Sequence, residues 1–136
     1  MKNLIAVLLL SMLVAGTAVA QSKTVRANIP FDFVAGQKSL PAGSYTVRSL
    51  GASGDVLGIK TDNSNGAMAM SHPVISSKRA DKTTLLFRSY AGEYFLAQVW
   101  IEGEQAGREL PITRRERMLA QNHPPLRVPV LAQLGK

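Results

Sequence analysis

The chain has no cysteine, only one tryptophan and only two histidines among its 136 residues. Without cysteine there is no disulfide, no thiolate metal ligand and no cysteine nucleophile. A zinc site needs three or four converging side chains, and His72 and His123 each precede a proline in a separate turn context. We therefore expect no metal and no bound cofactor, and stability must come from apolar burial and a well-paired backbone.

Recognisable catalytic motifs are also lacking. The sequence contains no Gly-x-Ser-x-Gly nucleophile elbow and no glycine-rich phosphate-binding loop. Ser71 and His72 are neighbours, so on a strand they would point to opposite faces. Hydrolysis by paired carboxylates needs a defined separation, which nothing enforces on Glu102, Glu104 and Glu109. We expect a protein without enzymatic activity, and a hydrolase using these glutamates is the weakest alternative.

The longest apolar run stands at the N-terminus. Lys2 precedes residues 4–14, which are apolar except for Ser11, and small residues lead up to Ala20 and Gln21. This order predicts a secretory signal peptide, residues 1–20, cleaved between Ala20 and Gln21. The run is shorter than the roughly 20 residues of a membrane span, and a lipoprotein would need a cysteine. We expect a mature chain of 116 residues, from the 136 less 20, in the periplasm or the medium without a transmembrane segment.

Basic residues exceed acidic ones, and one basic group is dense. Without the signal peptide, 15 Lys and Arg face nine Asp and Glu, a net charge of +6. A basic chain can bind nucleic acid, anionic lipid or acidic polysaccharide, although scattered cations are more typical of solvent-exposed strand faces. Arg114, Arg115 and Arg117 can contact an anionic surface or a partner, or pair with Glu109 and Glu116. Because no aromatic residues are interleaved with the arginines, we expect no nucleic-acid partner.

Most of the mature chain alternates apolar and polar residues, which predicts half-buried strands. Pro30 predicts a bend, bulge or edge in the first strand, and Pro73 predicts that Ala67–Ile75 is an edge strand. Residues 83–90 and 94–101 form the clearest hairpin. In its second arm we expect Phe95, Ala97, Val99 and Ile101 on one face and Tyr94, Leu96, Gln98 and Trp100 on the other.

The C-terminal part of the chain no longer shows the alternation of the strands and contains a predicted helix and tail. Thr113 and Glu116 fit a capping box at the start of a short helix over about residues 114–121, which needs Met118 or Leu119 packed on the sheet. The proline-containing tail, residues 122–136, can be extended, disordered or docked. We predict an all-β single domain over residues 21–121: an antiparallel β-sandwich or small barrel of six to seven strands with this helix.

Three stretches carry a resemblance: PFDFVAG at residues 30–36, LPAGSYTV at 40–47, and GREL at 107–110 ahead of the basic helix. Together they resemble a group of small exported bacterial proteins of unknown function, over about Val25 to Leu119. The resemblance implies export and a compact β-rich domain. It implies no activity, catalytic residue or ligand.

We therefore expect an exported, non-enzymatic binding or structural module of the cell envelope or medium. A ligand would enter between the sheets, or a protein partner would add a strand beside Ala67–Ile75. The alternative is electrostatic attachment to an anionic surface or polymer through the three clustered arginines.

Overall fold

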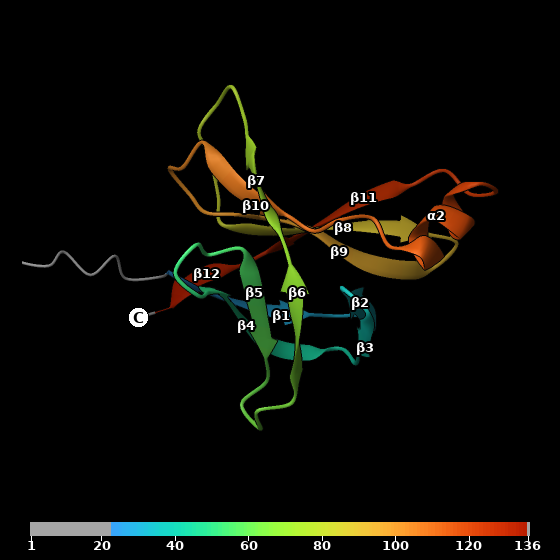
Figure 1. Cartoon of the computed structure of the whole chain (residues 1–136), viewed down its shortest axis with the longest axis horizontal. Helices are drawn as coiled ribbons and strands as arrows, with labels where there is room; N and C mark the ends of the chain where they lie inside the picture. Colours follow the sequence, from blue (N-terminus) through green and yellow to red (C-terminus); the bar gives the residue numbers. More distant parts are fainter. Residues whose placement is uncertain (1–22, 136) are drawn as a thin grey trace, which may run out of the picture.

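The computed structural model describes residues 23–135, so the predicted signal peptide and its cleavage point at Ala20 and Gln21 lie outside the described residues. Two sheets pack face to face, and one short helix lies beside an end of the second sheet (Figure 1). The elements are β1 (Thr24–Ile29), β2 (Phe33–Ala35), β3 (Lys38–Leu40), β4 (Gly43–Leu50), β5 (Val56–Lys60), β6 (Gly66–Met70), β7 (His72–Ile75), β8 (Thr84–Tyr90), β9 (Glu93–Trp100), β10 (Ala106–Glu109), α2 (Arg114–Ala120), β11 (Leu126–Leu131) and β12 (Gln133–Gly135). The predicted all-β sandwich with a short C-terminal helix is confirmed.

Sheet A has the strand order β12-β1-β4-β5-β6, and sheet B has the order β11-β8-β9-β10-β7. The short strand β2 runs parallel to β9 and carries β3 on its other side, whereas the other pairings are antiparallel. The β8–β9 hairpin turns at Ala91 and Gly92, whose φ angles of 50° and 86° are those of a two-residue hairpin turn. This is the hairpin that the sequence predicted most clearly.

Three long segments bend from one sheet into the other, so each counts as two strands. Together with the short strands β3 and β10 and the strands of the tail, this raises the number among residues 23–135 to twelve, above the predicted six or seven. The chain leaves sheet A for sheet B at Pro30, between β1 and β2, where a bend was one predicted outcome. It makes the same change at Ser71, so residues 66–75 form an edge of both sheets, as Pro73 predicted. It returns to sheet A at Ala132, and the tail is therefore docked through β11 and β12.

The core lies between the sheets and is rich in aromatic contacts. Phe33 packs edge-on against Tyr45 from sheet A and against Phe87 from sheet B, with ring centroids 5.1 and 5.5 Å away. Phe31 stacks on Tyr94 at 3.8 Å and meets Phe87 edge-on at 5.0 Å. These contacts join both sheets, because the rings come from segments in each of them.

A β-bulge in β9 overturns the predicted assignment of its two faces. Leu86 pairs with Gln98, but the next residue, Phe87, pairs with Leu96, so Ala97 is an extra residue. The alternation therefore shifts at this point. Tyr94, Leu96, Val99 and Ile101 pack with the core cluster between the sheets, whereas Phe95 and Ala97 are buried outside that cluster.

Candidate functional site

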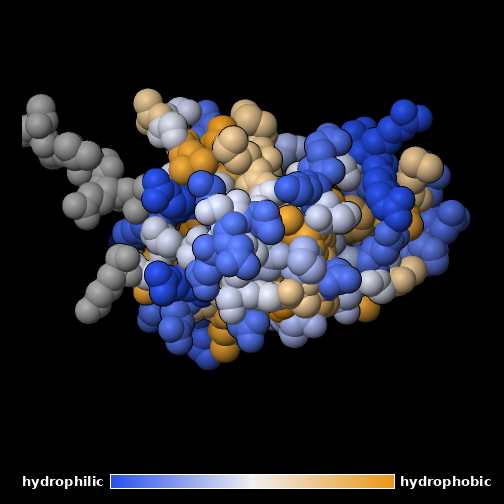
Figure 2. Space-filling model, turned by 90° about the horizontal axis from the view of Figure 1, so that it is seen from below, coloured by the Kyte–Doolittle hydropathy of each residue, from blue (hydrophilic) through white to orange (hydrophobic). Residues whose placement is uncertain are grey.

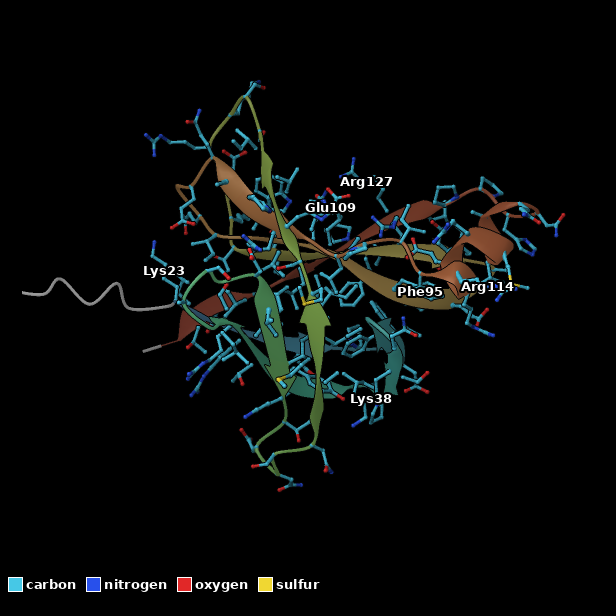
Figure 3. The ribbon with its side chains drawn as sticks, viewed as in Figure 1. Lys23, Lys38, Phe95, Glu109, Arg114 and Arg127 are labelled. Atoms are coloured by element: carbon cyan, nitrogen blue, oxygen red, sulfur yellow. The ribbon has the colours of Figure 1, made fainter. Side chains whose placement is uncertain are left out.

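The outer face of sheet B, the side turned away from sheet A, carries two groups of polar side chains. Leu85 and Phe87 of β8 lie in the core, so Leu86, Arg88 and Tyr90 point to this outer face. In Figure 3, Arg127 and Glu109 extend from the side of sheet B that faces away from sheet A, and Phe95 lies near Arg114 at the α2 end. The face thus has two halves, one beneath α2 and one beyond it.

The half beneath α2, which we call the covered half, centres on a buried carboxylate. Glu116 is 1% exposed, although it belongs to a helix that is otherwise largely exposed. Its Oε2 accepts hydrogen bonds from Arg88 Nε at 2.5 Å and from the Tyr90 hydroxyl at 2.9 Å. Phe95 pairs with Arg88 across the strands and packs edge-on against Tyr90 at 5.9 Å. Glu116 is therefore paired and hydrogen-bonded, as a buried charge must be.

This network corrects the prediction for how the helix is held. Thr113 caps α2 as expected, because its hydroxyl accepts from the Glu116 amide at 3.2 Å. The Glu116 side chain, however, bonds to Arg88 and Tyr90 on β8, where the capping box predicted a return to the Thr113 amide. Met118 is 59% exposed and Leu119 is half-buried, so the helix is attached mainly through its carboxylate.

Tyr90 is the titratable group that this arrangement perturbs. Burial raises the pKa of its hydroxyl, and the hydrogen bond to the Glu116 carboxylate raises that pKa further. Both effects favour the neutral phenol, since a phenolate would be desolvated and would repel Glu116. Tyr90 therefore acts as a hydrogen-bond donor here.

The other half of the outer face is open and contains a groove of about 470 Å3, which we call the Trp100 groove. The floor comes from β8 and β9, and the rim comes from β11 and from the connection between β7 and β8. Thr84, Leu86 and Trp100 form the floor, and Lys78, Arg79, Asp81, Lys82 and Arg127 stand around it. The volume is within the range of about 300–1,000 Å3 that small-molecule sites occupy.

Hydrogen bonds hold the indole of Trp100 in place. Its Nε1 donates to Gln98 Oε1 at 2.8 Å, and Gln98 Nε2 donates to Glu109 Oε2 at 3.2 Å. A Cβ at Gly107 of the neighbouring strand would lie 2.8 Å from ring atoms of Trp100, so the indole packs against the bare backbone there. The polar atom of the indole is thus satisfied, and only its apolar ring surface is left for a ligand.

The groove is lined by four basic residues and by one acidic residue, Asp81. Arg79 donates to the Gly103 carbonyl at 2.7 Å. Within residues 23–135, no ion pair involves Lys78, Lys82 or Arg127. The groove therefore combines an aromatic floor with positive charge that is not neutralised by the described part of the chain.

The arginines predicted as an anion site lie elsewhere, on α2. Arg115 forms an ion pair with Glu93, and Arg88 is the cation that pairs with Glu116. Arg114 and Arg117 are exposed. Figure 2 shows strongly hydrophilic side chains at the end where Figure 1 places α2. Electrostatic attachment through these arginines remains a prediction, and none of them lines the Trp100 groove.

The space between the sheets is small. A slot of about 230 Å3 opens at one end and is lined partly by Val47, Leu57 and Val99. Lys23 and Glu104 form an ion pair of 2.5 Å among the residues that line it. A ligand between the sheets would therefore have less room than small-molecule sites provide. The Trp100 groove is the better candidate.

Ala67–Ile75, the segment predicted to receive an added strand, lies within β6 and β7, each of which leaves an edge of its sheet exposed. Met68, Met70 and Ile75 are 67%, 62% and 79% exposed along it. Lys38 Nζ donates to the Gly66 carbonyl at 2.7 Å, so one end of this edge is already occupied. Strand addition by a partner remains a prediction for the rest of it.

The acidic and histidine candidates are not brought together. Glu104 pairs with Lys23, whereas Glu109 accepts from Gln98 on the outer face, and Glu102 lines a different hollow from Glu104. Ser71 is buried and His72 is exposed, as expected for neighbours on a strand, and His123 is exposed beyond α2. Among residues 23–135 there is no group of three or more His, Cys, Asp or Glu that can hold a metal ion.

The sequence contained a signal for the groove that alternation alone did not reveal. Lys78, Arg79 and Lys82 stand close together in one connection and precede the hairpin that contains the only tryptophan. Their spacing along the sequence is also typical of solvated cations, and Arg127 lies in the tail, for which the sequence leaves several structures open. Their convergence depends on the pairing of β11 with β8 and of β8 with β9.

Comparison with protein-family models, curated proteins and solved structures finds no match to this chain. Function is therefore inferred from the geometry of the described residues. In residues 23–135, no helix is long and apolar enough to cross a membrane.

Proposed function

We propose that the protein is an exported, non-enzymatic binding module that takes an anionic ligand in the Trp100 groove. The observation that carries this proposal is the clustering of four cations around the only tryptophan of the chain, in a hollow of ligand size. Three of the cations have no ion-pair partner in the described part of the chain. Export rests on the predicted signal peptide, which lies outside the described residues.

The grouping of the cations supports this choice of site. Arg88, Arg108 and Arg115 are paired with carboxylates, and within residues 23–135 cations without an ion pair also occur outside the groove. The groove, however, brings four cations together around Trp100. A set of cations held together without such partners raises the local concentration of anions. The half-buried indole beside them adds an apolar surface on which part of a ligand can rest.

Two variants with the same net charge test the site. The first is Lys78→Gln/Lys82→Gln/Arg127→Gln in the groove, and the second is Arg114→Gln/Arg115→Gln/Arg117→Gln on α2. Both mature proteins are applied to beads carrying dextran sulfate and eluted with a salt gradient, since salt screens exposed charges over about 8 Å at physiological ionic strength. We expect the groove variant to elute at clearly lower salt than the α2 variant.

The reverse order of elution would contradict the groove and favour the alternative, attachment through the α2 arginines. Equal shifts for the two variants would also contradict the proposal, because they would show that only net charge matters. A groove variant that elutes with the unchanged protein would overturn it as well.

A further inference from the structure

We infer that the ligand of the Trp100 groove is an acidic oligosaccharide, with one sugar ring on the indole and its carboxylates on the cations at either end. This inference rests on the proposed function, because it names the class of anion that the same groove takes. It follows from the surface that Trp100 offers, from the positions of the cations and from the shape of the site.

The tryptophan selects for a ligand with a flat apolar face. Because Gln98 already accepts the indole N–H, Trp100 has no donor left for a polar partner. Leu86 adjoins it on the floor and extends the apolar surface. A pyranose ring presents such a face through its C–H groups and keeps its hydroxyls at the periphery. A compact inorganic anion has no apolar face and would gain nothing from the indole.

The cations stand at both ends of the floor. Trp100 pairs with Thr84, close to Lys82, whereas Arg127 pairs with Arg88, four residues further along β8. The backbone positions of Thr84 and Arg88 lie about 13 Å apart along β8, at a rise of about 3.3 Å per residue, and Lys78, Lys82 and Arg127 all line the groove. Lys78 and Lys82 therefore mark one end and Arg127 the other. A chain that carries an acidic group on successive rings can reach both ends while one ring covers Trp100.

Two other polyanions fit the groove less well. Proteins that bind single-stranded nucleic acid stack successive bases on several aromatic side chains, and this groove has one. A membrane surface is met by apolar side chains that protrude into the headgroup region. Trp100 is half-buried at the floor of a hollow, where a flat lipid surface would not reach it.

The single tryptophan makes the test direct, since its fluorescence reports on the groove alone. The mature protein is titrated with tri-galacturonate, with the neutral trisaccharide maltotriose and with tripolyphosphate. We expect tri-galacturonate to change the Trp100 emission and to bind more tightly than either other probe by about tenfold or more, because only it combines rings with carboxylates.

Variants separate the two parts of the site. Trp100→Leu should lower the affinity for tri-galacturonate by about fivefold or more, because the sugar ring loses its stacking surface, and calorimetry measures this affinity. Lys82→Gln/Arg127→Gln, at two exposed positions, should weaken the binding of tri-galacturonate more than the charge-matched control Arg114→Gln/Arg117→Gln does.

Four results would overturn the inference. If tripolyphosphate binds as tightly as tri-galacturonate, the groove is a general anion site without selectivity for sugars. If maltotriose binds as tightly, the carboxylates do not contribute to binding. No response to tri-galacturonate, with groove-dependent retention on dextran sulfate intact, would reject the uronate-type ligand and leave the proposed function standing. If tri-galacturonate gives no response and retention on dextran sulfate does not depend on the groove, the groove is rejected as a binding site.

Discussion

The covered half and the Trp100 groove are built on the same two strands, β8 and β9, yet they treat charge in opposite ways. Beneath α2, Glu116 is held by Arg88 and Tyr90 and almost no surface remains exposed. In the groove, Lys78, Lys82 and Arg127 have no ion-pair partner in the described part of the chain.

This difference teaches which charges stabilise the fold. A buried carboxylate must be paired, because its desolvation is costly, so its partners become part of the structure. Hydrated cations need no partner and can stay available to a ligand. The predictions below test whether one half serves mainly stability and the other mainly binding.

The largest effect is expected from Glu116→Ala. The substitution leaves Arg88 without its partner beneath α2, and breaking such a pair costs roughly 3–5 kcal/mol in the free energy of unfolding. Urea unfolding measures this loss. Glu93→Ala, which breaks the exposed pair with Arg115, is the matched control and should cost less than about 1 kcal/mol. If both variants lose a similar free energy of unfolding, the buried ion pair of the covered half stabilises the fold no more than an exposed one.

A double substitution sharpens the same point. Arg88→Met/Glu116→Leu removes both charges and keeps apolar volume beneath α2, so part of the stability lost in Glu116→Ala should return, less the cost of leaving the buried Tyr90 hydroxyl without its acceptor. Urea unfolding of this variant and of each single variant gives the coupling between the two residues. A double variant less stable than either single one would show that the network cannot be replaced by packing.

A smaller effect concerns pH. Burial, and then the hydrogen bond to Glu116, raises the pKa of Tyr90, so the folded protein keeps a proton that the unfolded chain loses near pH 10. The stabilisation is complete below the unfolded pKa and is lost as pH rises through the folded pKa, so the free energy of unfolding should fall above about pH 10.

Tyr90→Phe should cost about 1 kcal/mol at neutral pH through the lost hydrogen bond, and it should reduce the alkaline slope. Part of the slope should remain, because burial and then the charge of Asp32 also raise the pKa of Tyr45. Unfolding free energies measured from neutral to alkaline pH provide the check. An unchanged slope in Tyr90→Phe would assign the alkaline loss to other groups.

The smallest effect is expected in the groove. Lys78→Gln/Lys82→Gln/Arg127→Gln should change the free energy of unfolding by no more than about 0.5 kcal/mol, since exposed substitutions without buried partners seldom do more. The thermal midpoint measures this, with the α2 triple variant as control. Clear destabilisation would mean that the groove cations support the fold, and the comparison between the halves would fail.

Local signals carried the prediction of the strands and of the helix. Alternation over a few residues indicated the strands, Pro73 indicated an edge, and Ala91 with Gly92 joined the strongest hairpin. Thr113 placed the start of the helix correctly, because its hydroxyl caps an amide only three residues away. Each of these effects operates within a few residues, so the chain alone is enough to reveal it.

The β-rich class, the hairpin and the capped helix therefore follow from the amino-acid sequence. The face that each β9 residue takes depends on long-range pairing, because the bulge at Ala97 arises from its register with β8. The tertiary structure likewise brings Glu116 to Arg88, 28 residues away, and Arg127 to the floor that holds Trp100. These placements depend on contacts between distant segments, and burial and strand pairing select them where local alternation does not.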